Sequence, residues 1–277
     1  MTHFHSTLRE LIRGILQEDA GPGKSLSLVS QLQAVNSGLA DAGLGLEVGI
    51  FYTSSMNNSE IAFALQNTGW RSRGLKPILL AARTPEGTPN IDRMVRQALD
   101  RDKADRIPDL KDSSVAAAVA QIPWGSISFS TPSYITDEGP CSKARIVRLT
   151  TGTRSGWGPL LYDLAMEKAS VLGGLAPDRH SVSSDARAIW QKYDTARPDV
   201  EKVQLDVPHE TLQSRPEFWR EQLTPDDNSD DCGMASAAEE ERDGWWRASP
   251  LSRAYRKSGW GTTAALDAAG LLWRPGR

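Results

Sequence analysis

The segment TTGTRSGWGPLLYDLAMEKAS, residues Thr150–Ser170, joins a glycine-containing turn to an amphipathic run. Gly156 and Gly158 permit backbone angles that other residues avoid, and they leave room for a ligand beside the main chain. Pro159 suits the first position of a helix, because its missing N–H would have no acceptor there and its φ is already helical. We therefore predict a strand, a bare turn and a helix over Pro159–Ser170. The free N–H groups and the positive end of the helix dipole would face an anion such as phosphate.

Two common nucleotide-binding motifs are excluded at this turn. A dinucleotide fingerprint requires a third glycine at a fixed spacing and an acidic residue about twenty positions later. A P-loop requires a Gly-Lys-Ser/Thr sequence. Neither pattern is present, and a plain tight turn also explains two glycines after a strand. Whether the turn binds a ligand must therefore be judged from the elements on either side of it.

Strand and helix patterns alternate on both sides of this turn. The expected strands, identified by β-branched and aromatic content, are Leu46–Ser55, 76–82, Trp124–Ser130, Lys143–Thr151 and 200–207. The expected helices, identified by apolar spacing and capping residues, are Leu26–Ala40, Ser59–Gln66, Ile91–Lys103, Ser113–Gln121, 178–194, 249–257 and 262–272. Ser183 or Ser184 provides the cap of the helix within 178–194. Together these elements predict an α/β or α+β fold.

The chain is expected to consist of one main domain with appendages. Its 277 residues are enough to bury a large core. We place an amphipathic helix and hinge at 1–24, the main domain at 25–207, an acidic flexible linker at 208–244 and an aromatic, basic tail at 245–277. The aspartates of the linker lack the alternating spacing and the closing glutamate of a calcium loop. The N-terminal helix fits either packing on its own domain or docking to a protein partner.

Composition restricts the partners and the compartment. The formal net charge of −3 argues against a surface made wholly for nucleic acid. In the tail, aromatic rings interleaved with Arg and Lys would suit single-stranded nucleic acid, but tryptophans also fix a tail to its own domain, which we expect here. Cys141 and Cys232 lie in unlike contexts and predict two free thiols and no metal cluster. No run approaches the ~18 apolar residues of a membrane span, so we expect a cytoplasmic protein without a membrane partner.

The strand ending in RIVRLTT, the turn, the helix after it and the segment SVSSDARAIWQKY resemble the central part of the GCN5-related N-acetyltransferase (GNAT) superfamily. The resemblance covers Trp124–Asp206. It implies a GNAT-like central mixed, twisted sheet flanked by helices, with acetyl-CoA as the acyl donor and no metal. Both motifs look most similar to divergent GNAT-like proteins of bacteriophages. This implies a phage product that acts in the host bacterial cytoplasm or is carried in the virion.

In this family the turn holds the pyrophosphate of acetyl-CoA. The pattern is Arg or Gln, two residues, Gly, any residue, then Gly or Ala. Gly156 and Gly158 match the small positions, while Thr153 stands at the Arg/Gln position and Arg154 is displaced from it by one. The cofactor-binding residues that the resemblance implies are the strand residues Arg148, Leu149 and Thr150, through their backbone, and the turn residues Thr153, Arg154, Ser155, Gly156, Trp157 and Gly158.

The second family motif is a helix with the pattern Asn, two residues, Ala, three residues, Tyr. Ser183 stands at the Asn position, Ala186 matches, and Trp190 replaces the Tyr, which in the family often protonates the departing thiolate. Ser183 and Trp190 are accordingly expected beside the cofactor. An indole cannot supply that proton. Tyr193, three residues on, is the nearest substitute, and a tyrosine packed at the domain edge explains it equally well.

The implied reaction is acyl transfer from a CoA thioester to an amine by direct attack in a ternary complex. A general base must remove a proton from the amine, and Asp178 and His180 are the first candidates. His180 also fits a surface or capping histidine, and Asp178 also fits an ion pair with a nearby arginine. The sequence does not specify the acceptor amine. The alternative function is a non-catalytic GNAT scaffold in a phage virion or interaction protein, since the family Arg/Gln and Tyr are both replaced.

Two further features near the turn have alternative interpretations. Asp163 and Glu167 lie one helical turn apart and could act as paired carboxylates, but we expect them on the solvated face of the helix. Trp157 either lies against the cofactor or covers the sheet.

Overall fold

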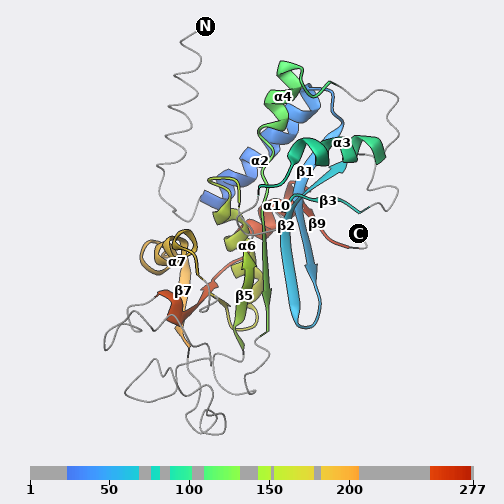
Figure 1. Cartoon of the computed structure of the whole chain (residues 1–277). Helices are drawn as coiled ribbons and strands as arrows, with labels where there is room; N and C mark the ends of the chain where they lie inside the picture. The colour runs from blue at the N-terminus through green and yellow to red at the C-terminus, as the bar shows by residue number, and fades with distance from the viewer. Residues whose placement is uncertain are drawn as a thin grey trace, which may run out of the picture.

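A computed structural model describes residues 24–68, 76–81, 88–101, 109–131, 143–150, 153–177, 182–205 and 250–275. They form a mixed nine-stranded sheet in the order β7-β8-β6-β5-β4-β2-β1-β9, with β3 paired to β2 (Figure 1). The strands are β1 (Leu46–Ser54), β2 (Asn58–Asn67), β3 (Ile78–Leu79), β4 (Ser126–Ser130), β5 (Arg145–Thr150), β6 (Leu175–Ala176), β7 (Val200–Gln204), β8 (Arg253–Lys257) and β9 (Leu272–Trp273).

Helices pack on this sheet along its whole width. They are α2 (Lys24–Asp41), α3 (Ile91–Arg101), α4 (Ser113–Val119), α6 (Gly158–Ser170), α7 (Ser184–Ala196) and α10 (Gly261–Ala268), with a 3₁₀ turn, η4 (Pro250–Ser252). Helix α6 contacts β2, β4, β6 and β8, and α2 packs on β1, α6 and α10. Figure 1 shows α7 beside β7 at one end of the sheet, and α3 packs on β2 in the other half of the sheet. The expected α/β or α+β class is confirmed.

Most predicted elements are present, with shifted ends. The predicted helices at Leu26–Ala40, Ile91–Lys103, Ser113–Gln121 and Pro159–Ser170 correspond to α2, α3, α4 and α6. The helix predicted within 178–194 corresponds to α7, whose N-cap is Ser183: its side chain accepts the N–H of Ala186 at 3.2 Å. The N-terminal helix, the acidic linker and both cysteines lie outside the described residues.

The helix predicted at Ser59–Gln66 is wrong, because this segment is strand β2. It pairs with β1 in an antiparallel hairpin and with β4 on its other side. Ala62 and Ala64 favour a helix by intrinsic propensity. Ile61 and Phe63 are β-branched and aromatic, however, and a short continuous apolar run of this kind is typical of a strand that is buried on both faces. All four of these side chains are buried.

Strands β5 and β6 form the parallel pair of the sheet's centre. Only Arg145 and Ile146 of β5 pair with β6, opposite Leu175 and Ala176. The rest of β5 pairs with β4 alone, and a register shift between Ser128 and Phe129 places a bulge in that ladder. Among the described residues, the parallel pairing therefore covers the first two residues of β5, and β5 leads toward the turn before α6.

The C-terminal segment is part of the sheet. Residues 249–257, expected as a helix, instead form η4 and β8, and β8 lies between β6 and β7. Tyr255 at its centre is fully buried. Helix α10 then leads to β9, which pairs in parallel with β1 at the far edge. The segment expected as a tail thus provides an internal strand, β8, in one half of the sheet and the edge strand β9 in the other.

Candidate functional site

The turn between β5 and α6 is built around Gly156, whose φ of 87° is open mainly to glycine. The N–H of Trp157 donates to the carbonyl of Arg154 at 3.1 Å and closes the turn. Helix α6 begins directly afterwards, at Gly158. The N–H groups of Ser155, Gly156 and Gly158 donate to no acceptor among the described residues. The predicted sequence of strand, turn and helix is confirmed, and it gathers free donors at a helix N-terminus.

Thr153, at the family's Arg/Gln position, is packed into the fold. Its side chain lies against Gly125 at the start of β4, where an added Cβ would come within 2.4 Å of its Cγ2. Gly125 has a φ of 136°, so both the angle and the close approach require glycine. A Cβ added at Gly158 would lie 3.5 Å from Thr153 Oγ1, which is an ordinary contact. A single added carbon would therefore fit at Gly158, which is itself buried.

Arg154 is turned away from the free amides. Its Nη1 donates to the carbonyl of Ile122 at 3.2 Å and to that of Ala120, both just after α4. A cation at the C-terminal end of a helix is favourably placed, because the carbonyls there have no partners within the helix. Burial lowers the pKa of the guanidinium. Arg154 thus ties the turn to α4, which leaves the displaced phosphate contact without support.

Trp157 covers the sheet. Only 7% of its surface is exposed, and its ring meets Phe63 of β2 edge-on, with centroids 5.6 Å apart and planes at 87°. This is one of the two alternatives that the sequence left open.

The strand residues implied for cofactor binding follow Arg145 and Ile146, the two residues of β5 that pair with β6. Leu149 and Thr150 pair with β4, and Arg148 lies at the bulge between the two registers. Arg148 is exposed, and its Nε donates to Ser130 Oγ at 2.7 Å. The hydroxyl of Thr150 lies 3.3 Å from that of Tyr162 on α6.

Trp190 and Tyr193 of α7 belong to a buried aromatic cluster. Trp190 stacks on Tyr255 with centroids 5.1 Å apart and meets Tyr162 edge-on at 5.3 Å. Tyr193 lies 6.3 Å from Tyr162 and 6.4 Å from Tyr255. These rings join α6, α7 and β8. Ser183, as the N-cap of α7, is exposed at the other end of that helix.

Tyr193, which the sequence offers as a proton donor to the thiolate, has its hydroxyl bonded inside the protein. It donates to Asp163 Oδ1 at 2.6 Å in the interior. Burial, and then the charge of Asp163, raise the pKa of Tyr193 well above its ordinary value. The hydroxyl of Tyr193 therefore keeps its proton, which it donates in a hydrogen bond to a carboxylate of α6. The proposed bases Asp178 and His180 lie outside the described residues.

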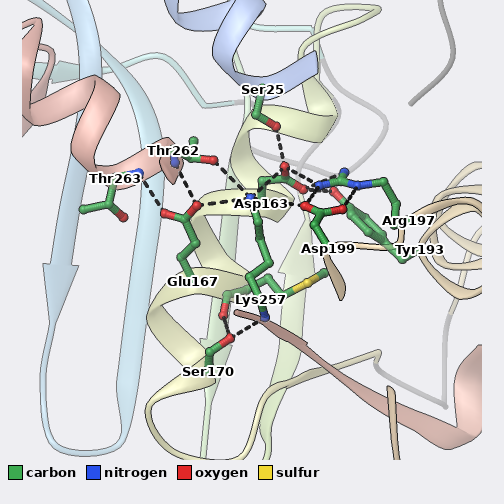
Figure 2. Close-up of polar contacts among 11 residues, drawn as sticks. Ser25, Asp163, Glu167, Ser170, Tyr193, Arg197, Asp199, Lys257, Thr262 and Thr263 are labelled. Carbon is green, nitrogen blue, oxygen red and sulfur yellow. Dashed lines mark hydrogen bonds and ion pairs between the residues drawn. The ribbon is translucent and has the colours of Figure 1, made fainter. Parts of the chain in front are cut away.

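Asp163 is the centre of a buried polar network that the sequence did not predict (Figure 2). Its carboxylate accepts from Ser25 Oγ at 2.5 Å, from both Arg197 Nη atoms at 3.1 and 2.9 Å and from Lys257 Nζ at 3.2 Å. Arg197 also forms a bidentate pair with Asp199 at 2.8 and 2.7 Å. The network therefore links α2, α6, α7 and β8.

Glu167, one turn further along α6, caps another helix. Its two oxygens accept the N–H groups of Thr262 at 2.8 Å and Thr263 at 2.7 Å, at the start of α10. Trp260, the N-cap residue of α10, offers no side-chain acceptor of its own. Lys257 Nζ bonds to Glu167 at 3.1 Å. Glu167 thus replaces the missing local cap and holds α10 on α6.

The electrostatics of the network favour ionised carboxylates. Burial acts to raise the pKa of Asp163, but the hydrogen bonds from Arg197 and the charges of Lys257 and Arg197 outweigh it, so the pKa is lowered. The hydrogen bond from Arg197 lowers the pKa of Asp199. Asp163 and Glu167 are 0% and 1% exposed, so the expectation of a solvated face is wrong.

One signal in the sequence could have placed these two acids in the interior. Helix α6, from Gly158 to Ser170, has no polar face: apolar residues occupy every side of it, and ten of its residues are buried. A helix that is apolar all round is buried, and acids on it must find cationic partners. The partners themselves could not be predicted, because Lys257 follows Asp163 by 94 residues.

Comparisons with known proteins give this chain no relative. No family model, curated protein or solved structure matches the chain. The described part of the chain holds no group of three or more His, Cys, Asp or Glu side chains placed to bind a metal ion. None of the helices described is long and apolar enough to cross a membrane.

Proposed function

We propose that the chain is an acyl-CoA-dependent N-acyltransferase of the GNAT type that transfers an acyl group to an amine. The observation that carries the proposal is the turn with free amides at the start of α6, which follows a strand that pairs in parallel with β6 at Arg145 and Ile146. In the GNAT superfamily a strand at this place leaves its parallel neighbour to admit the cofactor, and the glycine turn follows that strand.

Each part of this site has a role in the proposed reaction. Backbone amides of β5 between Arg148 and Thr150 would bind the pantetheine arm, and one of them would polarise the thioester carbonyl. The amides around Gly156 and the N-terminus of α6 would hold the pyrophosphate. Because Tyr193 is bonded to Asp163, it is not part of the proposed chemistry. Asp178 and His180 remain the candidate bases.

Acetyl-CoA binding is the first test. A ligand that binds only the folded state stabilises it by about 2.7 kcal/mol at a hundred times its Kd, so the melting temperature should rise with acetyl-CoA concentration. Gly158→Asp should abolish this rise, because a carboxylate would then occupy the phosphate position. An added Cβ meets only ordinary contacts there, and an acid suits a helix N-terminus, so the variant should fold.

Gly259→Asp is the matched control. It adds the same charge at an exposed glycine with nothing within 4 Å of an added Cβ, and it should respond to acetyl-CoA as the parent does. The proposal fails if millimolar acetyl-CoA and longer acyl-CoA thioesters leave the melting temperature of the parent unchanged.

A second candidate function is a GNAT scaffold that binds without catalysis. It is favoured by Trp190, which stands at the position of the family Tyr and is fully packed between Tyr162 and Tyr255. Thiol release from acetyl-CoA over a panel of small amines, lysine peptides and aminated nucleobases separates the two functions. Binding without release on any acceptor would support the scaffold, and amine-dependent release would exclude it.

A further inference from the structure

Glu60, near the start of β2, differs from the other acids that are at least partly buried. Among the side chains that the structure describes, these acids are Glu47, Glu60, Asp163, Glu167, Asp194 and Asp199. All of them except Glu60 accept a hydrogen bond or form an ion pair within the protein. The carboxylate of Glu60 has neither with any described residue. Partial burial of a carboxylate without a donor is unfavourable, so a donor from outside the protein would stabilise it.

The side chain of Glu60 projects from the face of the sheet away from α6. Tyr52 of β1 faces α6, because the Nζ of Lys168 on that helix lies 5.3 Å from the centroid of its ring. Side chains alternate along a strand, so Phe51 and Thr53 lie on the other face, and Glu60, which pairs with Thr53, shares that face. Figure 1 shows α3 and α4 at the far end of this hairpin from the turn that follows β1. The surroundings of Glu60 are therefore away from both of these helices.

The neighbours of Glu60 suit an ammonium group. Ser128 of β4 pairs with Glu60 on the side opposite Thr53, so the carboxylate lies between two hydroxyl-bearing residues whose Cβ atoms are about 5 Å from its own. Phe51 is diagonal to Glu60 and partly exposed. An ammonium donates three hydrogen bonds, which one carboxylate and two hydroxyl oxygens can accept. An aromatic ring beside them attracts the cation and the methylenes attached to it.

We propose that Glu60, Thr53 and Ser128, with Phe51 beside them, bind an alkylammonium group of a small polyamine. The charge of the carboxylate and the number of acceptors around it match this ligand. The binding itself does not depend on acyl transfer, whereas the use of the polyamine as the acyl acceptor rests on the proposed function.

The position of the site relative to β5 indicates why the acceptor would carry more than one amine. Ser128 also pairs with Leu149, so two strand spacings, about 10 Å, separate Glu60 from the strand proposed to bind the thioester. A carboxylate favours the charged form of the ammonium that it binds, so a second amine would react at β5. There the C–N bond forms as the C–S bond of the thioester breaks, and the amine proton ends on the thiol of CoA.

Calorimetric titration of the full chain with spermidine at constant ionic strength tests the ammonium site directly. We expect saturable binding in the absence of acyl-CoA. Glu60→Gln should weaken this binding by about tenfold, because the charge-assisted hydrogen bond is lost, while its similar shape should leave the melting temperature unchanged. Glu201→Gln removes the charge of an exposed acid on β7 and should bind spermidine as the parent does.

Two results would overturn the ammonium site. They are the absence of saturable spermidine binding to the parent, and equal affinities of the parent and Glu60→Gln. Tighter binding of a peptide with a single lysine than of spermidine would overturn the assignment to a small polyamine.

The role of the polyamine as acceptor is tested by thiol release from acetyl-CoA. Glu60→Gln should raise the KM for spermidine by about tenfold, while acetyl-CoA should stabilise this variant as it stabilises the parent. If acetyl-CoA stabilises the parent but spermidine causes no thiol release, the acceptor role is overturned. If acetyl-CoA does not stabilise the parent and spermidine still binds through Glu60, the acyltransferase proposal fails and the ammonium site stands.

Discussion

Asp163 shows why a charged residue can occupy the interior of this protein. Four residues donate to its carboxylate, namely Ser25, Tyr193, Arg197 and Lys257. Two of them are cations, so the charge of Asp163 is offset where it is buried. A buried ion pair does not necessarily stabilise the fold more than apolar residues in the same place would. Removing one partner, however, leaves the charge of the other buried and uncompensated. The cost of a change at Asp163 is therefore larger than that of one hydrogen bond.

Asp163→Asn is predicted to destabilise the fold strongly. The amide has nearly the same shape but carries no charge, so Arg197 and Lys257 lose their shared counter-ion. Breaking a buried pair in this way typically costs about 3–5 kcal/mol. Urea unfolding at neutral pH would measure the loss. Asp41→Asn, at an exposed position, is the control and should change stability by less than about 0.5 kcal/mol. Equal effects of the two substitutions would contradict a central role for Asp163.

At the scale of single elements, α10 depends on α6 for its N-terminus. The N–H groups of Thr262 and Thr263 have their acceptors on Glu167, 95 and 96 residues earlier in the chain. A helix of eight residues has little stability alone, so its position depends on such contacts. Strand β9 follows α10 directly and pairs with the edge strand β1. Removal of the Glu167 carboxylate should therefore destabilise both α10 and the strand β9 that follows it.

Glu167→Ala is predicted to loosen α10 and β9 before the rest of the sheet. The amides of Thr262 and Thr263 would lose their acceptors, so their hydrogen exchange should become faster. The same should hold for Leu272 in β9. Hydrogen exchange followed by mass spectrometry would compare these peptides with those of β2. Glu201→Ala on β7, where the carboxylate is exposed, should leave α10 unchanged. Uniform acceleration over the whole sheet would contradict local capping.

The elements that the sequence predicted are those whose signals are local. Ser183 caps α7 through an amide three residues away, and the turn at Gly156 is defined within a few residues. Strands β2 and β8 were missed because helix-favouring residues such as Ala62 are overruled by pairing with distant strands. The polar network was missed for the same reason, since Ser25 and Asp163 are 138 residues apart. Local sequence patterns therefore predicted the turn before α6, but not the contacts with distant residues that fix α6 in the fold.

At the scale of the whole molecule, the network makes stability depend on pH. The pKa values of Asp163 and Asp199 are both lowered in the folded state. Burial acts to raise the pKa of Asp163, but Arg197 and Lys257 outweigh it. Arg197 lowers the pKa of Asp199. In the unfolded chain an aspartate has a pKa near 3.9, so the unfolded state binds more protons as the pH falls. The stability from these groups is therefore complete above about pH 5 and is lost as the pH falls through the folded-state values.

Asp199→Asn is predicted to flatten this acid dependence. The variant should be less stable than the parent at neutral pH, and the difference should shrink as the pH falls below about 5, where the unfolded chain takes up a proton at this aspartate, until the folded state is protonated too. Urea unfolding at several pH values would test it. In Asp41→Asn the curve should follow that of the parent. Parallel curves for Asp199→Asn and the parent would show that this carboxylate does not contribute to acid unfolding.

The position of β8 between β6 and β7 predicts that the sheet cannot form without the C-terminal segment. Tyr255 is fully buried, and Lys257 reaches the carboxylates of Asp163 and Glu167. A chain that ends at residue 249 would lack both, and it would leave β7 without its partner strand. It should show no cooperative thermal unfolding, whereas a separable tail at 245–277 would leave a folded domain. Adding a peptide of residues 250–275 should restore cooperative unfolding, because β8 pairs through its backbone. Cooperative unfolding of the truncated chain alone would show instead that the segment is a tail.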